Sequence, residues 1–157
     1  MLITIFFIFP LEAETVFLYL EDDWLTTDMR RGSEWIAGGL ADGVMEQFFD
    51  AGYIVFDGEN SFGVSGQPEN RRISLLTAKK GGAHVLLEMV ILYDEEEPVP
   101  ASYPRGIRFS ARRVETDASF LEEELLTAPF LTPAVQDERE VCRRLGAAAA
   151  KLVLEGM

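Results

Sequence analysis

The residues of this chain that could carry out catalysis are few and far apart. It has one histidine, His84, and one cysteine, Cys142. A Ser-His-Asp or Cys-His catalytic set would have to use His84. This residue stands early in a stretch typical of a buried strand, where a side chain has little freedom to transfer protons, so we expect a packed or edge histidine. One Cys and one His also cannot build a zinc site of the usual nitrogen and sulfur ligands.

Cys142 and a pair of glutamates offer two further alternatives. Arg143 and Arg144 follow Cys142 and could lower its pKa, but a cysteine well inside a helix is more typical of a small core residue. Glu122 and Glu124 share one face of a strand and could serve as acid and base, although an exposed charged face is the simpler interpretation. We therefore predict no catalytic residues, no cofactor, no metal ligands, and a protein that is not an enzyme.

The polar segment 57–70, DGENSFGVSGQPEN, is the best candidate for a ligand loop. It follows a predicted strand, and ligands of open parallel sheets bind beyond the carboxyl ends of the strands. The side chains lack the spacing of a calcium loop. A small-ligand-binding or hydrolytic domain that uses this loop is the alternative function. Its candidate residues are Asp57, Glu59, Asn60 and Ser61.

The stretch that would position these groups runs from Ser33 to Asp57. Ser33 can cap a helix, and Gly52 supplies the left-handed residue that ends it. The segment Tyr53–Phe56 is short and β-branched, as expected of a strand. Within the helix, apolar residues recur every four positions and form one stripe: Ile36, Leu40, Val44 and Phe48.

Three glycines inside this helix suggest a close contact. Gly38, Gly39 and Gly43 each cost the helix roughly 1 kcal/mol relative to alanine. The favoured explanation is close approach to the sheet or to a neighbouring helix, and the alternative is a contact surface for another chain. Trp24 and Trp35 flank the loop before the helix. They would anchor a partner if exposed, or else they close the end of the core.

The remaining pattern predicts a mixed sheet. Strands are expected at Thr15–Leu20, at Ala83–Tyr93 and from Ile107 to Ala111, and a β-bulge would explain why the alternation slips at Arg112–Val114. Segment 119–126 fits either a strand or a short helix, and we favour the strand because a hairpin would extend the sheet.

Two more helices complete the prediction. One spans Glu69–Lys80 with Ile73, Leu76 and Thr77 on its inner face. The last is capped by Thr132 and begins with Pro133. Its apolar stripe is Val141, Leu145, Ala148 and Leu152. The order βαβαββ(β)α predicts a single α/β domain at 14–157, with helices packed on a mixed sheet.

The composition excludes several classes of function. The net charge of -13 opposes binding to nucleic acid and to anionic lipid. The apolar run Leu2–Phe9 is too short to span a bilayer, which takes about 20 residues, so no stable membrane span is expected. It has the length of the hydrophobic region of a signal peptide, with Ala13 before the cleavage point. We therefore expect a signal peptide at 1–13 and a periplasmic or secreted protein; the alternative is a first buried strand.

Two segments carry a family resemblance. The sequence FFDAGYIVFD closes the main helix and KKGGAHVLLEMVILYD leads into the strongest strand. This pattern resembles periplasmic envelope modules of the curli-secretion-channel and penicillin-binding-protein-activator lipoprotein group. The resemblance implies a non-enzymatic module that mediates protein–protein interaction in the assembly or regulation of envelope machinery, with a protein partner or a homo-oligomer. The sequence departs from that group because no cysteine follows the apolar run to carry a lipid.

Overall fold

A computed structural model describes residues 13–22, 33–57, 63–64, 68–93, 104–131 and 137–157 of this chain. Several predictions fall outside these residues. They concern the signal peptide and the expected start of the last helix at Thr132 and Pro133. Four candidate-site residues also lie outside: Trp24, Glu59, Asn60 and Ser61.

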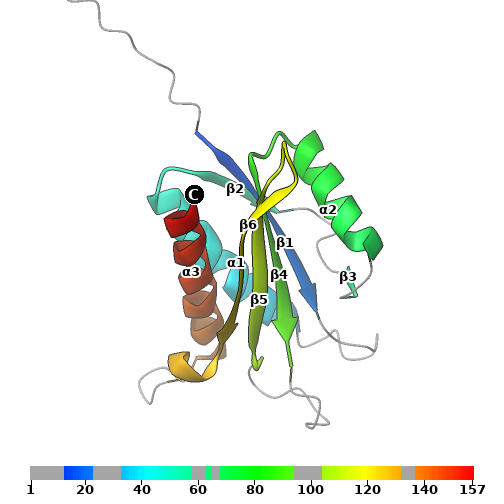
Figure 1. The fold of residues 1–157 in the computed structure, drawn as a ribbon. Helices are drawn as coiled ribbons and strands as arrows, with labels where there is room; N and C mark the ends of the chain where they lie inside the picture. Colours follow the sequence, from blue (N-terminus) through cyan, green and yellow to red (C-terminus); the bar gives the residue numbers. More distant parts are fainter. Residues whose placement is uncertain (1–12, 23–32, 58–62, 65–67, 94–103, 132–136) are drawn as a thin grey trace, which may run out of the picture.

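The described residues form one mixed sheet, as the sequence predicts (Figure 1). Its main strand order is β2-β1-β4-β5-β6, and the two-residue β3 pairs with the end of β1. Strand β1 is parallel to β2, β3 and β4, whereas β4–β5 and β5–β6 are antiparallel. The strands are β1 (Thr15–Asp22), β2 (Ile54–Asp57), β3 (Gly63–Val64), β4 (Val85–Leu92), β5 (Gly106–Arg113) and β6 (Ala118–Leu126).

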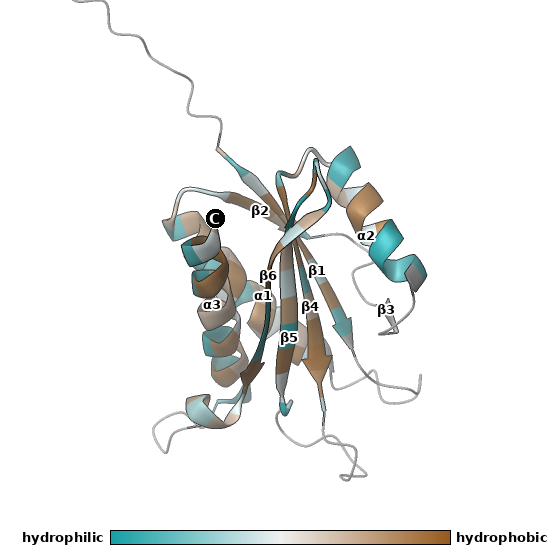
Figure 2. Cartoon of the chain, in the orientation of Figure 1, coloured by the Kyte–Doolittle hydropathy of each residue, from teal (hydrophilic) through white to brown (hydrophobic). Residues whose placement is uncertain are grey.

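Helices cover both faces of this sheet (Figure 1). Helices α1 (Ser33–Asp50) and α3 (Glu138–Gly156) pack side by side on one face and enclose the larger core. Helix α2 (Pro68–Lys80) packs on the other face over a smaller cluster around Phe17 and Leu86. Strand β4 lies between these layers and is hydrophobic along most of its length (Figure 2). A 3₁₀ helix at Ala128–Phe130 follows β6.

The main helix has the predicted form. The stripe of Ile36, Leu40, Val44 and Phe48 is buried in the larger core. Gly52 has a φ of 88°, which a residue with a side chain rarely adopts, and it ends the helix before β2. Asp57 is exposed at the end of β2. No helix in the described part of the chain is long and apolar enough to cross a bilayer.

The predicted inner face of α2 is wrong. Ile73 and Leu76 are about half exposed, whereas Ser74 and Ala78 are buried against the sheet. The reason lies on β4, where Glu88 faces α2 and accepts a hydrogen bond of 2.8 Å from the Ser74 hydroxyl. A polar partner on the sheet therefore turns the serine inward and leaves two apolar side chains facing solvent.

The last helix, α3, has a different N-cap from the one predicted, although residues 132–136 lie outside the described part of the chain. It starts at Glu138, and the Asp137 side chain caps it by accepting a 3.0 Å hydrogen bond from the Arg139 N–H. Its buried face is also rotated from the predicted stripe, since Ala148 and Leu152 are only half-buried. The buried residues are Val141, Cys142, Leu145, Gly146, Ala149, Ala150 and Val153.

Segment 119–126 is a strand, as favoured, and the predicted irregularity lies next to it. Residue Ala111 pairs with Leu121, whereas the next residue, Arg112, pairs with Ser119. Phe120 is therefore the extra residue, so that the bulge belongs to β6 rather than to β5. Asp117, with a φ of 55°, lies in the turn that joins the two strands.

Candidate functional site

Glycines on two helices bring α1 and α3 into close contact. A Cβ added at Gly39 would lie 2.8 Å from the carbonyl oxygen of Arg139, and one at Gly43 would overlap the carbonyl oxygen of Arg143. On α3, a Cβ at Gly146 would meet the carbonyl oxygen of Leu40. Close approach to a neighbouring helix therefore accounts for Gly39 and Gly43, which are both buried inside the protein.

Ion pairs border this contact on the solvent side. Arg139 Nη2 lies 2.6 Å from Asp42 Oδ2, and Arg143 pairs with Glu46. The two α1 residues and their two α3 partners follow one another in the same order along the chain, so the two helices run parallel. They begin at the same edge of the sheet, where the parallel strands β1 and β4 end (Figure 1).

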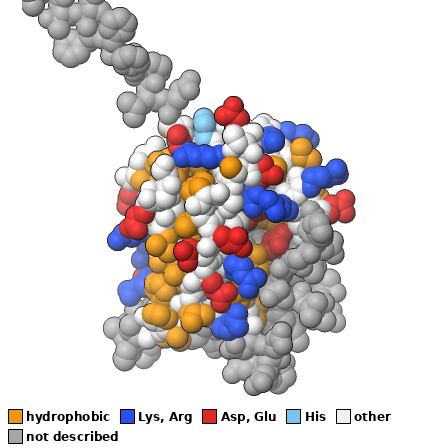
Figure 3. All heavy atoms as spheres, viewed as in Figure 1, with side chains coloured by type: hydrophobic (Ala, Val, Ile, Leu, Met, Phe, Trp, Pro, Cys, Tyr) orange, Lys and Arg blue, Asp and Glu red, His pale blue; other side chains and the backbone are white. Residues whose placement is uncertain are grey.

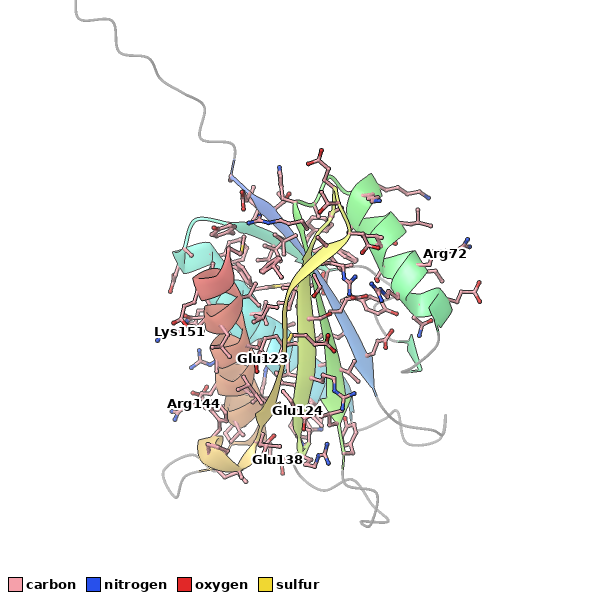
Figure 4. The ribbon with its side chains drawn as sticks, in the orientation of Figure 1. Arg72, Glu123, Glu124, Glu138, Arg144 and Lys151 are labelled. Atoms are coloured by element: carbon pink, nitrogen blue, oxygen red, sulfur yellow. The ribbon has the colours of Figure 1, made fainter. Side chains whose placement is uncertain are left out.

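A shallow groove opens between the first turns of these helices. It has a volume of about 390 Å³ and is lined by Trp35, Asp137, Glu138 and Arg139. Trp35 packs its half-buried ring against the larger core, and Glu138 stands at the lower end of α3 (Figure 4). We call this feature the Trp35 groove. It contains one of the two tryptophans that the sequence suggests as partner anchors.

Among the described residues, the lining of the Trp35 groove combines one aromatic ring with two carboxylates and one arginine. Its described residues include no serine, threonine, cysteine or histidine. The charge of Arg139 is balanced by Asp42, so Asp137 and Glu138 give the described part of the lining a negative charge. An indole ring beside carboxylates suits the stem and cationic end of a lysine or arginine side chain.

Gly38 lies one helical turn beyond Trp35 on α1. It is half-buried, and a Cβ added there would meet no atom within 4 Å. Unlike Gly39 and Gly43, it is therefore not required for the contact between the helices, and its predicted role in partner binding stays a prediction.

The other residues singled out by their chemistry lie apart from the groove. Cys142 is fully buried, and burial, with the nearby charge of Glu138, raises the pKa of its thiol to about 12. His84 is exposed at the start of the sheet, where its Nδ1 accepts a 3.1 Å hydrogen bond from the Thr15 N–H. The described residues contain no cluster of His, Cys, Asp or Glu arranged to hold a metal ion.

The sequence pattern does not predict the polar network that lies under α2. Arg112 is 5% exposed; its Nε lies 3.2 Å from Glu88 Oε2 and its Nη1 lies 2.9 Å from Asp117 Oδ1. Glu88 also accepts hydrogen bonds from Ser74 and, at 3.5 Å, from Ser110. The sequence signal is Glu88 itself, a single acidic residue within the apolar strand β4. The network joins α2 to the sheet, and its charges are paired within the protein.

Two residues of β1 extend this polar region. Burial raises the pKa of Glu21, and the charge of Glu88 raises it further, although hydrogen bonds from Tyr19 and Asn70 act in the opposite direction. The pKa of Tyr19 is also raised, first by burial and then by the charge of Glu21.

Comparisons with known proteins show likeness in structure alone. No protein-family model and no curated protein sequence matches the chain. TolB from Acinetobacter baumannii superposes with a TM-score of 0.51 at 12% identity over 92% of this chain. The PelC dodecamer from Paraburkholderia phytofirmans gives a TM-score of 0.46 at 14% identity, over 87% of this chain and 83% of PelC. The lipoprotein GNA1162 from Neisseria meningitidis gives 0.48 at 11% identity, over 92% of this chain and 99% of GNA1162.

These comparisons concern the fold. The chain spans 28% of the length of TolB, so it corresponds to one part of that protein. At such low identity the likeness carries no residue of a site from one protein to the other. The chain is therefore an α/β protein whose fold also occurs within TolB.

Proposed function

We propose that this protein is a non-enzymatic, periplasmic or secreted module that binds another protein through the Trp35 groove, in the assembly or regulation of envelope machinery. The observation that carries the proposal is the groove itself, in which a tryptophan ring lies beside two acidic side chains at the edge of the molecule. Tryptophan is among the residues that most often dominate the binding energy of protein interfaces.

The walls of the groove are held in place before any partner arrives. Gly39 lets the backbones of α1 and α3 meet at this end, and the pair between Asp42 and Arg139 bridges the two helices. A site that is already ordered loses little conformational entropy on binding. This rigidity favours recognition of a partner over an induced closure around a substrate.

The charge of the groove indicates the chemistry of the partner. Asp137 and Glu138 are negative, and the whole chain carries a net charge of -13. Both features attract a basic surface and speed its encounter with the protein. A lysine or arginine of the partner would lie against the Trp35 ring with its charge between the two carboxylates.

The envelope location rests on the sequence. The apolar run Leu2–Phe9 and the pattern resemblance to periplasmic envelope modules support export. The intact mass of the protein from each fraction of its native cell tests this part. A mass that begins near Glu14 in the soluble envelope fraction would support it, and a full-length protein in the cytosol would contradict it.

The contact itself is tested by photo-crosslinking in the native cell. A photoreactive amino acid replaces Glu138 in one variant and, as a control, Phe49, which is 56% exposed near the opposite end of α1. We expect a discrete adduct from the Glu138 position, either with an envelope protein or with a second copy of the chain, and none from the Phe49 position. Equal adducts at both positions, or none at either, would contradict the proposal.

A second pair of variants separates binding from folding. Trp35→Ala should lower the yield of the Glu138 adduct roughly tenfold or more, because tryptophan anchors contribute about 2 kcal/mol or more. Trp35 also packs against the core, so its removal can affect folding. Arg139→Lys therefore serves as a second variant, which keeps a positive charge beside Asp42 and leaves the core intact. This variant should retain the adduct, provided its circular dichroism matches the parent.

A further inference from the structure

Strand β6 is a long open edge of the sheet. It ends the strand order and, among the described strands, pairs only with β5. The opposite edge strand, β2, is less than half as long. An edge strand directs half of its backbone N–H and C=O groups away from the sheet, where they can pair with an added strand. Natural proteins usually protect such an edge against unwanted pairing. The side chains along the edge therefore decide which kind of strand can add to it.

Three consecutive acidic side chains occupy the centre of this edge. Glu122, Glu123 and Glu124 are all exposed. Glu123 lies on the α3 side of β6 and Glu124 on the other side (Figure 4). Because side chains alternate along a strand, Glu122 shares the side of Glu124. Glu124 forms ion pairs of 3.5 and 3.4 Å with Arg105 and Arg108. Within the described part of the chain, Glu122 and Glu123 form none, so both faces of the edge keep a free negative charge.

The same charges oppose antiparallel pairing with a second copy of this strand in the register centred on Glu123. An antiparallel pair of β6 strands centred on Glu123 would place Glu123 opposite Glu123 and Glu122 opposite Glu124. Like charges directly opposite each other destabilise a pair of strands. The basic residues of α3 that Figure 4 labels, Arg144 and Lys151, extend from the side of that helix away from β6 and do not offset this repulsion.

Apolar side chains flank the acidic centre. Leu121 and Leu125 are half-buried against the core, and Leu126 is 51% exposed. Figure 3 shows hydrophobic side chains toward the lower left of this face, beside acidic and basic side chains. Alternate side chains of an added strand would lie beside these residues. The edge thus presents backbone hydrogen-bonding groups, a negative centre and apolar contacts near its ends.

We propose that β6 is a docking edge for an extended, basic segment of another protein, which adds to the sheet as a further strand. Lysine or arginine residues at the centre of the segment lie opposite Glu122 and Glu123, and apolar residues toward its ends contact Leu126. This site is separate from the Trp35 groove and does not depend on it.

The test uses a synthetic peptide as long as β6, with lysines at its centre and valines around them. Fluorescence anisotropy measures its dissociation constant for the full chain. We expect saturable binding, and hydrogen exchange should show new protection in segment 118–126 and none in segment 35–46. Failure to bind, or protection confined to 35–46, would overturn the proposal and leave the acidic run as protection of the edge against aggregation.

Two matched controls separate strand addition from simple attraction of charges. A peptide with the same sequence but N-methylated on alternate residues keeps every charge and loses the backbone donors, so it should not bind. The variant with Glu122→Gln and Glu123→Gln should bind the parent peptide roughly threefold to tenfold more weakly. A variant with Glu115→Gln and Glu155→Gln, which loses two exposed charges elsewhere, should bind as the parent does. Equal binding of the N-methylated peptide would overturn the proposal.

One variant makes the site distinguishable from the groove. Trp35→Ala should leave the affinity of the peptide unchanged, because Trp35 belongs to α1 and lines the groove rather than the edge. A tenfold loss of affinity in this variant would place the peptide in the groove instead and overturn the assignment to β6.

Discussion

The carbonyl oxygen of Arg143 on α3 occupies the space that a side chain at Gly43 of α1 would need. Gly43→Ala should therefore force the two helices apart and lower the free energy of unfolding by about 2 to 3 kcal/mol, as overpacking does in other cores. Gly38→Ala is the matched control on the same helix, since a Cβ there meets nothing within 4 Å. It should raise stability by up to ~1 kcal/mol through helix propensity. Urea unfolding measures the free energy of unfolding of both variants. Equal changes in the two would contradict the close contact at Gly43.

Two arginines of β5 should differ sharply in their contribution to stability. Arg112→Leu leaves Glu88 half-buried without its cation, so we expect a loss of about 3 kcal/mol. Arg108→Leu removes only an exposed pair with Glu124, at 3.4 Å, and should cost about 0.5 kcal/mol or less. Adding Glu88→Gln to Arg112→Leu should recover part of the loss. Thermal unfolding of the three variants gives the comparison, and similar effects of the two single substitutions would contradict the buried pairing.

Glu140 should stabilise the protein at neutral pH and cease to do so in acid. Hydrogen bonds from Arg143 and then Arg144 lower its pKa from 4.5 to about 2. The unfolded chain therefore takes up the proton first as the pH falls, and the stabilisation is lost between pH 4.5 and about 2. Glu140→Gln should cost about 1 kcal/mol at pH 7 and nothing near pH 2. Glu155→Gln, at an exposed position near the end of the same helix, is the control for the loss of one negative charge.

The effect of Glu21 on stability should depend on pH in the opposite sense to that of Glu140. Burial raises its pKa in the folded protein above 4.5, so the folded state favours the protonated carboxyl and loses stability as the pH rises through this range. Glu21→Gln keeps an acceptor for the Tyr19 hydroxyl without the charge. It should be more stable than the parent at pH 7, with the difference shrinking below pH 4. A variant that is less stable at every pH would show that the hydrogen bonds outweigh burial.

Cys142 should be unreactive in the folded protein. Its side chain is fully buried and its pKa is raised to about 12, so little thiolate forms at neutral pH. A thiol reagent at pH 8 should label it only at the rate of unfolding, and labelling should become rapid in denaturant. Fast labelling of the native protein would contradict its place in the core.

Residues whose role depends on their own element were predicted correctly from the sequence. The spacing of Ile36, Leu40, Val44 and Phe48 places all four side chains on one side of a helix, whatever lies opposite. Gly52 likewise ends α1 through its own backbone conformation. In β4, the alternation of side chains places Leu87 and Met89 in the larger core and Leu86 on the α2 side.

Predictions failed where a distant residue decides the outcome. The pattern of α2 favours Ile73 and Leu76 as the inner face, but Glu88 on β4 draws Ser74 inward. The slip in β5 reveals an irregularity without showing that Phe120, on the other strand, is the extra residue. The Trp35 groove requires the first turns of α1 and α3 to meet, and no local pattern contains that information.

The pairing of α1 with α3 also affects how the chain can acquire its structure during synthesis. Its bridging ion pairs join residues 97 positions apart, and α3 follows every other described element in the chain. While the ribosome is still making the residues before Glu138, the glycine-bearing side of α1 has no helix to cover it. The larger core can therefore close only after α3 has emerged, and such long-range closure slows folding. A nascent chain halted before that point would present an apolar surface to chaperones.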